Sequence, residues 1–253
     1  MEPGPLKPDL TLIIPAFNEE KLIGSSLDEL LSQLSTRKMR AEIIIVDDGS
    51  TDQTASIVTD YQTRHPRVIL LKNERNRGKG YSIRRAVLQS TGEIIIFIDA
   101  DLPYAFESVQ LIFDVIKQGT QLAIGSRVLP ESELSDKIPL VRNLAGQTFS
   151  LLIRLLLFPG IPDTQCGLKG FRDREAKIIF EQVTIDGFGF DVEVLYLARR
   201  LGYKIQCVPV NLVFSRLDSR VRLLKDSFHM LFDLLRIRLN AYKGKYSVEE
   251  HVW

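Results

Sequence analysis

Short apolar runs rich in β-branched side chains alternate, over the first hundred residues, with segments whose apolar side chains recur at helical spacing. Such runs predict buried strands, and the helical spacing predicts amphipathic helices. Strands that alternate with helices form a parallel sheet covered on both faces, so the sequence predicts an α/β fold with a mostly parallel central sheet. The predicted strands are 10–15, 42–47, 68–71, 93–98, 122–125 and 203–210, and the predicted helices are 19–34, 52–64 and 81–89.

The chain has 253 residues, of which 45% are apolar and 26% charged, an ordinary globular composition that supports one substantial core. We expect one domain over residues 1–215, including an apolar helix at 143–158. Residues 216–253 are expected to form a basic amphipathic helix and tail rather than an independent domain.

The number of cysteines indicates the redox environment in which the protein is expected to work. Cys166 and Cys207 are too few for a disulfide framework, and no charged-then-apolar leader precedes a cleavage site. We therefore expect a reducing, cytoplasmic environment.

Positive charge is concentrated near the C-terminus. Residues 216–245 hold eight Lys or Arg against three Asp, which makes this segment +5 and the remainder −4. The segment 221–242 mixes these basic residues with aliphatic ones, a pattern that suits the plane of an anionic membrane surface. Packing on the sheet or a dimer interface is the alternative. Nucleic-acid binding is not expected, because the basic residues are interleaved with aliphatics rather than exposed aromatics.

The apolar helix at 144–158 bears on the same question. It contains Arg154 and has fifteen residues, whereas a bilayer crossing needs about twenty. We expect a peripheral protein at the cytoplasmic face of a membrane, with no spanning segment.

The run from Ile94 to Ile98 ends in Asp99-Ala100-Asp101, two carboxylates separated by one small residue. Ligands of open α/β sheets bind beyond the carboxyl ends of the strands, and paired carboxylates there suit Mg²⁺ or Mn²⁺. The first hypothesis is a metal-held phosphate.

Polar or glycine-rich segments also follow the first three predicted strands, at 15–20, 47–52 and 73–80. Parallel topology gathers them at one sheet edge beside the carboxylate pair. Each signal alone has a structural alternative, since Asp52 suits a helix N-cap and Asp47 and Asp48 suit a turn. Their ordered succession is the stronger observation.

That succession resembles the inverting glycosyltransferases of family 2, which have the GT-A fold. Within the family, the chain is similar to the branch that makes dolichyl-phosphate or polyprenyl-phosphate sugars, and to its glucosyl-transferring members. The motifs that carry the resemblance are Ile14–Glu20, Val46–Asp52, Asn76–Gly80, Asp99–Asp101, Gly125–Arg127, Asp163–Phe171 and Gly187–Glu193.

The resemblance implies a role for each matching residue on the donor side. Asp99 and Asp101, with Ala100 between them, would hold Mg²⁺ or Mn²⁺ on the donor diphosphate. Mannosyl relatives commonly carry a metal-binding glutamine where Pro103 stands, so water or diphosphate oxygens would complete the shell. Arg77 and Lys79 would border the nucleotide. The nucleoside pocket would be lined by Pro15, Ala16, Asn18, Glu19, Asp47 and Asp48.

The acceptor decides which further residues are needed. A phosphate monoester, with a second pKa of about 6, is already ionised at pH 7, so a catalytic base becomes optional and cationic anchors become necessary. Candidate anchors are Arg127, Arg142, Arg216 and Arg220. Asp191 matches the position where many relatives place a base, and an N-cap for the following helix is its alternative.

The sequence-based expectation is an inverting, metal-dependent transferase that moves a hexose onto dolichyl or polyprenyl phosphate, with glucose from UDP-glucose as the first choice. GDP-mannose is the second choice of donor. Two competing hypotheses are transfer to a soluble hydroxyl, which would make Asp191 indispensable as base, and a nucleotide-sugar-binding regulator without turnover. The oligomeric state and the choice between Mg²⁺ and Mn²⁺ stay open.

Overall fold

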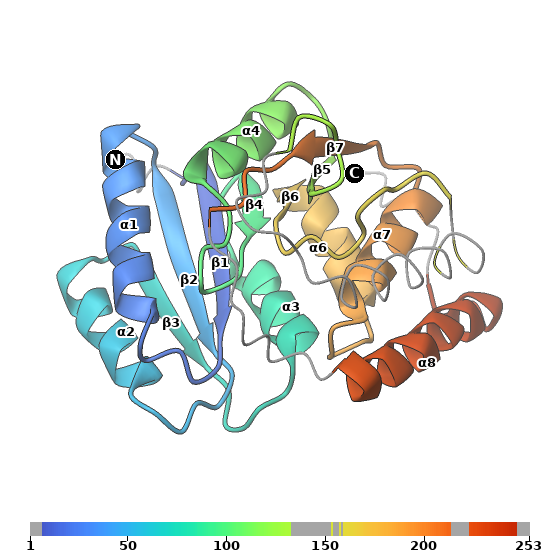
Figure 1. Cartoon of the computed structure of the whole chain (residues 1–253), viewed down its shortest axis with the longest axis horizontal. Helices are drawn as coiled ribbons and strands as arrows, with labels where there is room; N and C mark the ends of the chain where they lie inside the picture. The colour runs from blue at the N-terminus through green and yellow to red at the C-terminus, as the bar shows by residue number, and fades with distance from the viewer. Residues whose placement is uncertain (1–6, 133–152, 154–156, 158, 214–222, 247–253) are drawn as a thin grey trace, which may run out of the picture.

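A seven-stranded sheet runs through the part of the chain that the computed structural model describes, which is residues 7–132, 153, 157, 159–213 and 223–246 (Figure 1). The strand order is β3-β2-β1-β4-β6-β5-β7. The strands are β1 (Leu10–Ala16), β2 (Ala41–Asp47), β3 (Val68–Lys72), β4 (Ile94–Phe97), β5 (Leu122–Ser126), β6 (Lys169–Arg172) and β7 (Ile205–Pro209).

All neighbouring strands are parallel except at β6, which runs antiparallel to both β4 and β5. The predicted mostly parallel α/β sheet is therefore confirmed. The sequence analysis did not predict β6, because its four residues, two of them charged, lack the apolar run of a buried strand. It also did not predict the helices α4 and α6.

Helices cover both faces of the sheet, as the alternation of side chains along the central strands requires. Leu12 and Ile14 pack with α1, α2 and α4 on one face, whereas Ile13 packs with α3, α6 and α7 on the other. Figure 1 shows α1 and α2 beside β1 to β3, and α8 beyond α7. The helices are α1 (Ile23–Thr36), α2 (Thr54–Arg64), α3 (Lys79–Gln89), α4 (Phe106–Lys117), α6 (Asp173–Gln182), α7 (Phe190–Arg200) and α8 (Leu223–Tyr242).

Two helices begin later than predicted. The helix predicted from residue 19 begins at Ile23, because the backbone before it is held in a turn with Asn18 at φ 53°. The helix predicted from Asp52 begins at Thr54, and Gln53 is its N-cap residue. The Asp52 carboxylate still accepts a hydrogen bond from the Thr54 N–H at 2.9 Å, so it stabilises the start of the helix from one position further out.

The C-terminal helix α8 is attached to α7 and to the segment before it. Glu193 is fully buried and accepts hydrogen bonds from the N–H groups of Thr184 and Ile185 and from the Tyr246 hydroxyl, at 2.9, 2.8 and 2.7 Å. The Asn240 amide donates to the Thr184 hydroxyl oxygen at 3.1 Å. These buried polar contacts fix the end of α8 on the core.

Among the helices that the structure describes, none combines the length and the apolar character that a bilayer crossing requires. Most of the predicted apolar helix at 144–158 lies outside the described residues.

Candidate active site

The carboxyl ends of β1, β2 and β4 meet at one edge of the sheet. Ala16 at the end of β1 is in register with Asp47 at the end of β2, and Ile13 is in register with Phe97. The Ile98 N–H donates to the Ile13 carbonyl at 3.0 Å, which carries the chain from β4 into the Asp99–Asp101 turn. The predicted succession of loops is therefore brought together at this edge.

The turn after β1 is bound to the turn after β2. The Asn18 N–H donates to Ser50 Oγ at 2.8 Å, and Asn18 Oδ1 accepts from the Thr51 N–H at 2.8 Å. The Glu19 N–H donates to Thr54 Oγ1 at 2.7 Å. Pro15 and Asn18 are half-buried. These contacts give two predicted pocket residues, Asn18 and Glu19, a structural role in shaping the edge.

Asp48 holds the loop that follows β3. Its carboxylate accepts hydrogen bonds from the Asn73 amide at 2.7 Å and from the N–H groups of Arg77 and Gly78, each at 2.8 Å. Both Asp48 oxygens are thus engaged with the protein, and its contact with a base stays a prediction. The sequence analysis included Asn73 in the polar segment 73–80 but gave it no role of its own, although an asparagine directly after a strand is a usual turn signal. Asp47 is buried beside Asp48, and one of its oxygens accepts from the Ser50 N–H.

Asp99 forms an ion pair with Lys79. The Lys79 ammonium lies 2.6 Å from Asp99 Oδ1, with side-chain exposures of 16% and 36%. Burial lowers the pKa of Lys79, but the neighbouring carboxylates of Asp99 and Asp191 outweigh it and hold that pKa above its ordinary value, so Lys79 is an ammonium at pH 7. Arg77, the other predicted basic residue, is exposed and lies over the Tyr81 ring at 4.2 Å.

The donor set at this turn fits a hard divalent cation. Asp99 and Asp101 supply carboxylate oxygens, and Asp99 already holds a cation, the Lys79 ammonium. Within the described residues, no group of three or more His, Cys, Asp or Glu side chains could hold a metal. Two protein carboxylates completed by water and diphosphate oxygens suit Mg²⁺ or Mn²⁺.

The Asp99–Asp101 turn lies against a glycine and a helix. A Cβ added at Gly167 would lie 2.1 Å from Asp99 Oδ2, so the carboxylate rests directly on the Gly167 backbone. The Ala100 carbonyl accepts a hydrogen bond from the buried Ser26 hydroxyl at 2.7 Å. Leu102 closes the turn at φ 43°, a backbone region that few side chains adopt.

Arg127 is paired with Asp163. The guanidinium Nε and Nη2 lie 2.8 and 2.9 Å from the two Asp163 oxygens, and the Arg127 N–H also donates to Asp163. Burial raises the pKa of Asp163, but the paired guanidinium outweighs it and holds that pKa below its usual value. The sequence analysis named Asp163 only as the start of the Asp163–Phe171 motif and missed this bidentate pair, which joins residues 36 positions apart.

Asp191 is paired with Lys169, which the sequence analysis also missed. Lys169 on β6 is fully buried, and its ammonium donates to Asp191 Oδ1 at 2.6 Å and to the Cys166 carbonyl at 2.7 Å. The alternative that Asp191 is an N-cap is wrong, because α7 begins at Phe190 and the N-cap residue is Gly189. The available signal was the position of Lys169 between Leu168 and the Gly170-Phe171 pair. A lysine in such an apolar stretch is buried only when it has a partner.

The thiol of Cys166 packs beside the same ion pairs. It lies 3.3 Å from the Tyr104 hydroxyl, and burial raises the pKa of both groups above their ordinary values. A buried, protonated thiol is a poor nucleophile. This environment indicates that Cys166 packs rather than reacts.

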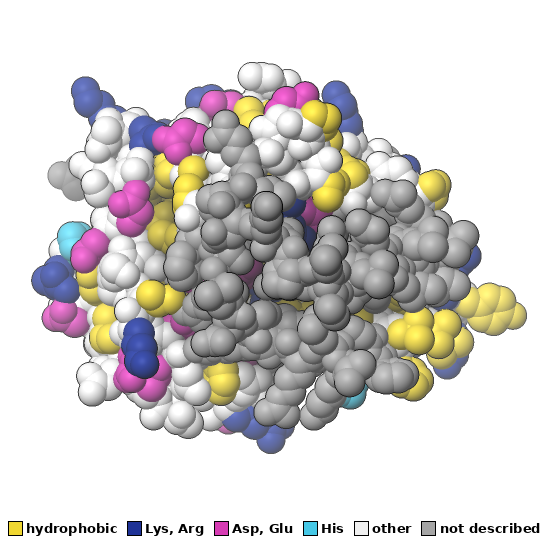
Figure 2. Space-filling view, viewed as in Figure 1, with side chains coloured by type: hydrophobic (Ala, Val, Ile, Leu, Met, Phe, Trp, Pro, Cys, Tyr) yellow, Lys and Arg dark blue, Asp and Glu magenta, His cyan; other side chains and the backbone are white. Residues whose placement is uncertain are grey.

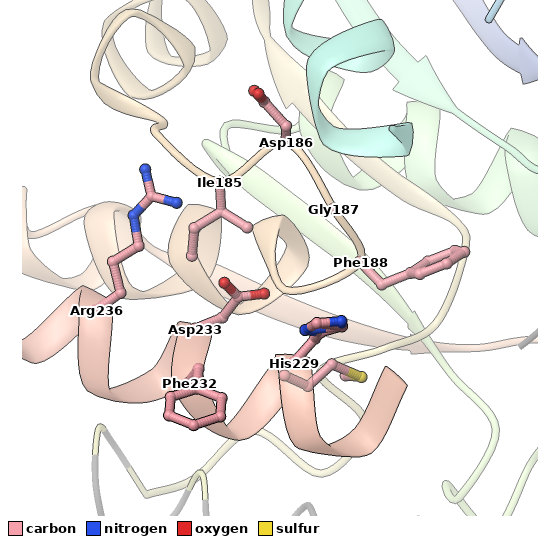
Figure 3. A pocket seen from close by; sticks show the side chains of 9 residues that line it. Ile185, Asp186, Gly187, Phe188, His229, Phe232, Asp233 and Arg236 are labelled. Carbon is pink, nitrogen blue, oxygen red and sulfur yellow. The ribbon is translucent and has the colours of Figure 1, made fainter. Parts of the chain in front are cut away.

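A cavity of about 350 Å³ lies between the segment before α7 and the helix α8 (Figure 3). Figure 3 shows Phe188 on one side and His229, Asp233 and Arg236 of α8 on the other. None of the predicted site residues lines this cavity. The carbonyl of Asp186, one of its lining residues, lies close to Gly78, so the cavity backs onto the loop that carries Lys79.

Three of the predicted anchors are not placed by the structure. Arg142, Arg216 and Arg220 lie outside the described residues.

A mostly parallel sheet with one antiparallel strand, and a carboxylate pair at the end of its central strand, define the class of nucleotide-sugar transferases with the GT-A fold. Comparison with known proteins supports this assignment to a class. The sequence matches the family model described as "Glycosyl transferase family 2" over residues 11–179. The chain therefore belongs to glycosyltransferase family 2 and is a glycosyltransferase.

Curated relatives extend this match along the chain. The dolichyl-phosphate beta-glucosyltransferase of Dictyostelium discoideum is 36% identical over 253 residues, covering 95% of this chain and 77% of the relative. The protein of the same name from Homo sapiens is 34% identical, covering 95% of this chain and 78% of the relative. The family resemblance found in the motifs is thereby confirmed.

Solved structures agree on the fold. Glucosyl-3-phosphoglycerate synthase from Mycobacterium tuberculosis, in complex with UDP, superposes with a TM-score of 0.67 at 21% identity, covering 91% of this chain and 80% of that one. The same synthase in complex with Mn²⁺, UDP and glucosyl-3-phosphoglycerate also superposes with a TM-score of 0.67, at 20% identity and with the same coverage. This likeness confirms the predicted GT-A fold.

Proposed function

We propose that this protein transfers glucose from UDP-glucose to dolichyl phosphate or a closely related polyprenyl phosphate, with inversion at the anomeric carbon. The observation that carries the proposal is the 36% identity, over 95% of the chain, to a dolichyl-phosphate beta-glucosyltransferase. A structural neighbour with the same fold has been crystallised with Mn²⁺ and UDP-glucose, which supports the donor and the cation.

The donor end of the site suits a nucleoside diphosphate. A divalent cation on Asp99 and Asp101 would act as a Lewis acid and neutralise the leaving diphosphate. The first residue of α3 is Lys79, so its ammonium and the positive end of the helix dipole favour an anion at this edge. Asp48 fixes this loop by accepting from the N–H groups of Arg77 and Gly78.

The acceptor end of the site suits a phosphate better than a hydroxyl. A hydroxyl acceptor wants a carboxylate base, but the Asp191 carboxylate is committed to the buried Lys169 ammonium at 2.6 Å. Arg127, which Asp163 holds in place, offers a fixed guanidinium to an anionic acceptor.

The chemical step follows from these charges. An oxygen of the acceptor phosphate attacks the anomeric carbon from the side opposite the diphosphate, a carbon–oxygen bond forms, and the bond to the diphosphate breaks with its electron pair leaving on UDP. The β product in the names of the relatives is what such an in-line displacement gives from an α-linked UDP-glucose.

A donor panel tests the proposal. The purified protein is incubated with dolichyl phosphate, Mn²⁺ and either UDP-glucose or GDP-mannose, and the lipid product is separated and its anomeric configuration read by NMR. The expected result is β-glucosyl lipid from UDP-glucose alone. Mannosyl lipid as the main product, or transfer only to soluble hydroxyl acceptors, would contradict the proposal. Donor binding without any product would favour a regulator without turnover.

We further propose that α8 docks on the cytoplasmic face of an anionic membrane. Phe232, Leu235, Leu239 and Tyr242 are exposed at 67%, 52%, 50% and 90%, and their spacing places them on one side of the helix. Figure 2 shows hydrophobic side chains gathered near α8. Arg238, Lys243 and Lys245 are exposed beside this stripe, as anionic headgroups require.

We also propose that α8 packs on the catalytic domain of residues 1–215 and does not form an independent domain. The contacts of Asn240 and Tyr246 with the core support this.

Sedimentation with anionic vesicles tests the membrane proposal. Changing Leu235 and Leu239 to Gln is expected to weaken vesicle binding several-fold, because interfacial binding scales with buried apolar area. Leu111→Gln on α4, an exposed apolar residue away from the stripe, is the matched control and should bind as the wild type does. Equal binding by all variants would contradict the proposal.

A further inference from the structure

Lys79 occupies the carboxylate on which the divalent cation is expected. Its ammonium lies 2.6 Å from Asp99 Oδ1, and ammonium and metal are competing partners for that oxygen. We propose that Lys79 is a built-in counter-ion: it holds Asp99 until the cation binds, and then moves to the donor diphosphate. This inference rests on the proposed function, since it needs a cation on Asp99 and a diphosphate beside it.

Asp99 has little freedom to receive the cation while Lys79 stays in place. A Cβ added at Gly167 would lie 2.1 Å from Asp99 Oδ2 and 2.9 Å from its Cγ, so that side of the carboxylate is closed by backbone. Oδ1 is the oxygen that Lys79 holds. A cation that binds Oδ1 therefore competes with the ammonium for that oxygen.

Any movement of Lys79 must come from its side chain, because its backbone is fixed. Asp48 accepts the Gly78 N–H at 2.8 Å, and the Tyr81 N–H donates to the Asp186 carbonyl at 3.2 Å. A Cβ at Gly80 would lie 2.4 Å from the Ile185 carbonyl oxygen, so the backbone also lacks space to shift. The flexible four-carbon stem of lysine then carries the whole movement.

The destination of the ammonium is the N-terminus of α3, where Lys79 is the first helical residue. Helix N-termini favour anions, and a diphosphate there gives the displaced Lys79 a new partner. Without the donor, a cation on Asp99 leaves the ammonium unpaired beside a double positive charge. The cation and the donor should therefore each raise the affinity for the other.

The test measures the binding of Mn²⁺ with no nucleotide present. Electron paramagnetic resonance quantifies the free Mn²⁺ ion at each point of the titration. Lys79→Met is expected to bind Mn²⁺ about tenfold more tightly than the wild type, because a competing charge on the carboxylate is removed. Lys79→Arg keeps the charge and should bind as weakly as the wild type. Arg75→Met removes an equal charge from an exposed position on the same loop and should leave Mn²⁺ affinity unchanged.

The second measurement is UDP binding at saturating Mn²⁺, where Lys79→Met is expected to lose about tenfold in affinity because the diphosphate has lost its ammonium partner. Unchanged or weaker Mn²⁺ binding by Lys79→Met, or unchanged UDP binding, would overturn the inference. Melting temperatures of the variants confirm that each is folded.

Asp101→Asn separates failure of this inference from failure of the proposed function. If Asp101→Asn lowers Mn²⁺ affinity while Lys79→Met does not raise it, the cation site stands and the counter-ion role is wrong. If Asp101→Asn leaves Mn²⁺ binding unchanged, the cation does not bind at this turn. The counter-ion role of Lys79 and the metal-dependent part of the proposed function are then both wrong.

Discussion

The proposed donor side and the proposed acceptor side of the site are held together in different ways. On the proposed donor side, carboxylates accept hydrogen bonds from backbone N–H groups: Asp48 accepts from those of Arg77 and Gly78, and Asp52 from that of Thr54. On the proposed acceptor side, buried ion pairs join charged side chains on different segments. The Arg127–Asp163 pair links positions 36 apart, and the Lys169–Asp191 pair links positions 22 apart.

This difference has an energetic consequence. Hydrogen bonds to backbone at turns are individually modest and tolerate solvent, whereas a buried charge that loses its partner is costly. The acceptor side should therefore be the fragile part of the site, and the donor side should tolerate substitution while it changes function.

The largest expected effect is that of Lys169→Met, which leaves the buried Asp191 carboxylate without its partner. We expect a loss of about 3–5 kcal/mol in the free energy of unfolding, measured by denaturant titration. Lys79→Met breaks a partly exposed pair and should cost less than Lys169→Met, about 1 kcal/mol. Equal losses in the free energy of unfolding for Lys169→Met and Lys79→Met would contradict the proposed difference between the two sides of the site. Adding Asp191→Leu to Lys169→Met should recover part of the loss, because no unpaired charge remains.

Gly167→Ala should act on activity rather than on stability. The new Cβ would lie 2.1 Å from Asp99 Oδ2 and push the carboxylate away, and a displacement of this kind is expected to lower kcat about 100-fold. The control is Gly24→Ala in α1, where the nearest atoms lie 3.8 Å away and the helix should become slightly more stable. A Gly167→Ala enzyme with wild-type kcat would show that the position of Asp99 is unimportant.

Asp163→Asn should cost about 2 kcal/mol at pH 7, because the Arg127 guanidinium loses a charged partner. The pH dependence has a definite sign. The folded pKa of Asp163 lies below its ordinary value of 3.8, so its contribution is complete above that value and is lost as the pH falls through the lowered folded pKa. Unfolding measured between about pH 5 and pH 2 should thus be less steeply acid-dependent in Asp163→Asn than in the wild type. Parallel curves would contradict this.

The smallest effect is expected on the donor side. Asp52→Ala removes the acceptor for the Thr54 N–H at the start of α2 and should cost about 1 kcal/mol in thermal or denaturant unfolding. Asp60→Ala, which breaks an exposed pair with Arg64 in the same helix, should have almost no effect. Equal losses would mean that Asp52 does not stabilise the helix start.

The sequence was informative where structure is local. The alternation in β1, in which Leu12 and Ile14 face one helix layer and Ile13 the other, follows directly from a period of two, and the turn residues after β2 and β4 stand at the strand ends where they were expected. β6 was not predictable in this way, because Lys169 is buried only by virtue of a carboxylate 22 positions later. Such pairs leave no periodic signal, since the partner is supplied by the tertiary fold.

The same reasoning explains the two interpretations of Asp191. A carboxylate near a helix start, two residues after Gly189, favours either a cap or a base when seen in the sequence alone. The deciding contact comes from Lys169 on β6, which lies 22 positions earlier in the chain, and it makes Asp191 the partner of a buried lysine instead.

The central claim is that Asp99 and Asp101 bind the cation that the donor diphosphate needs. Isothermal titration of UDP-glucose into wild-type protein and into Asp99→Ala/Asp101→Ala, each with and without Mn²⁺, tests it most directly. We expect Mn²⁺-dependent binding by the wild type and loss of that dependence, with much weaker binding, in the double variant. Tight binding of UDP-glucose by the double variant, independent of Mn²⁺, would contradict the claim.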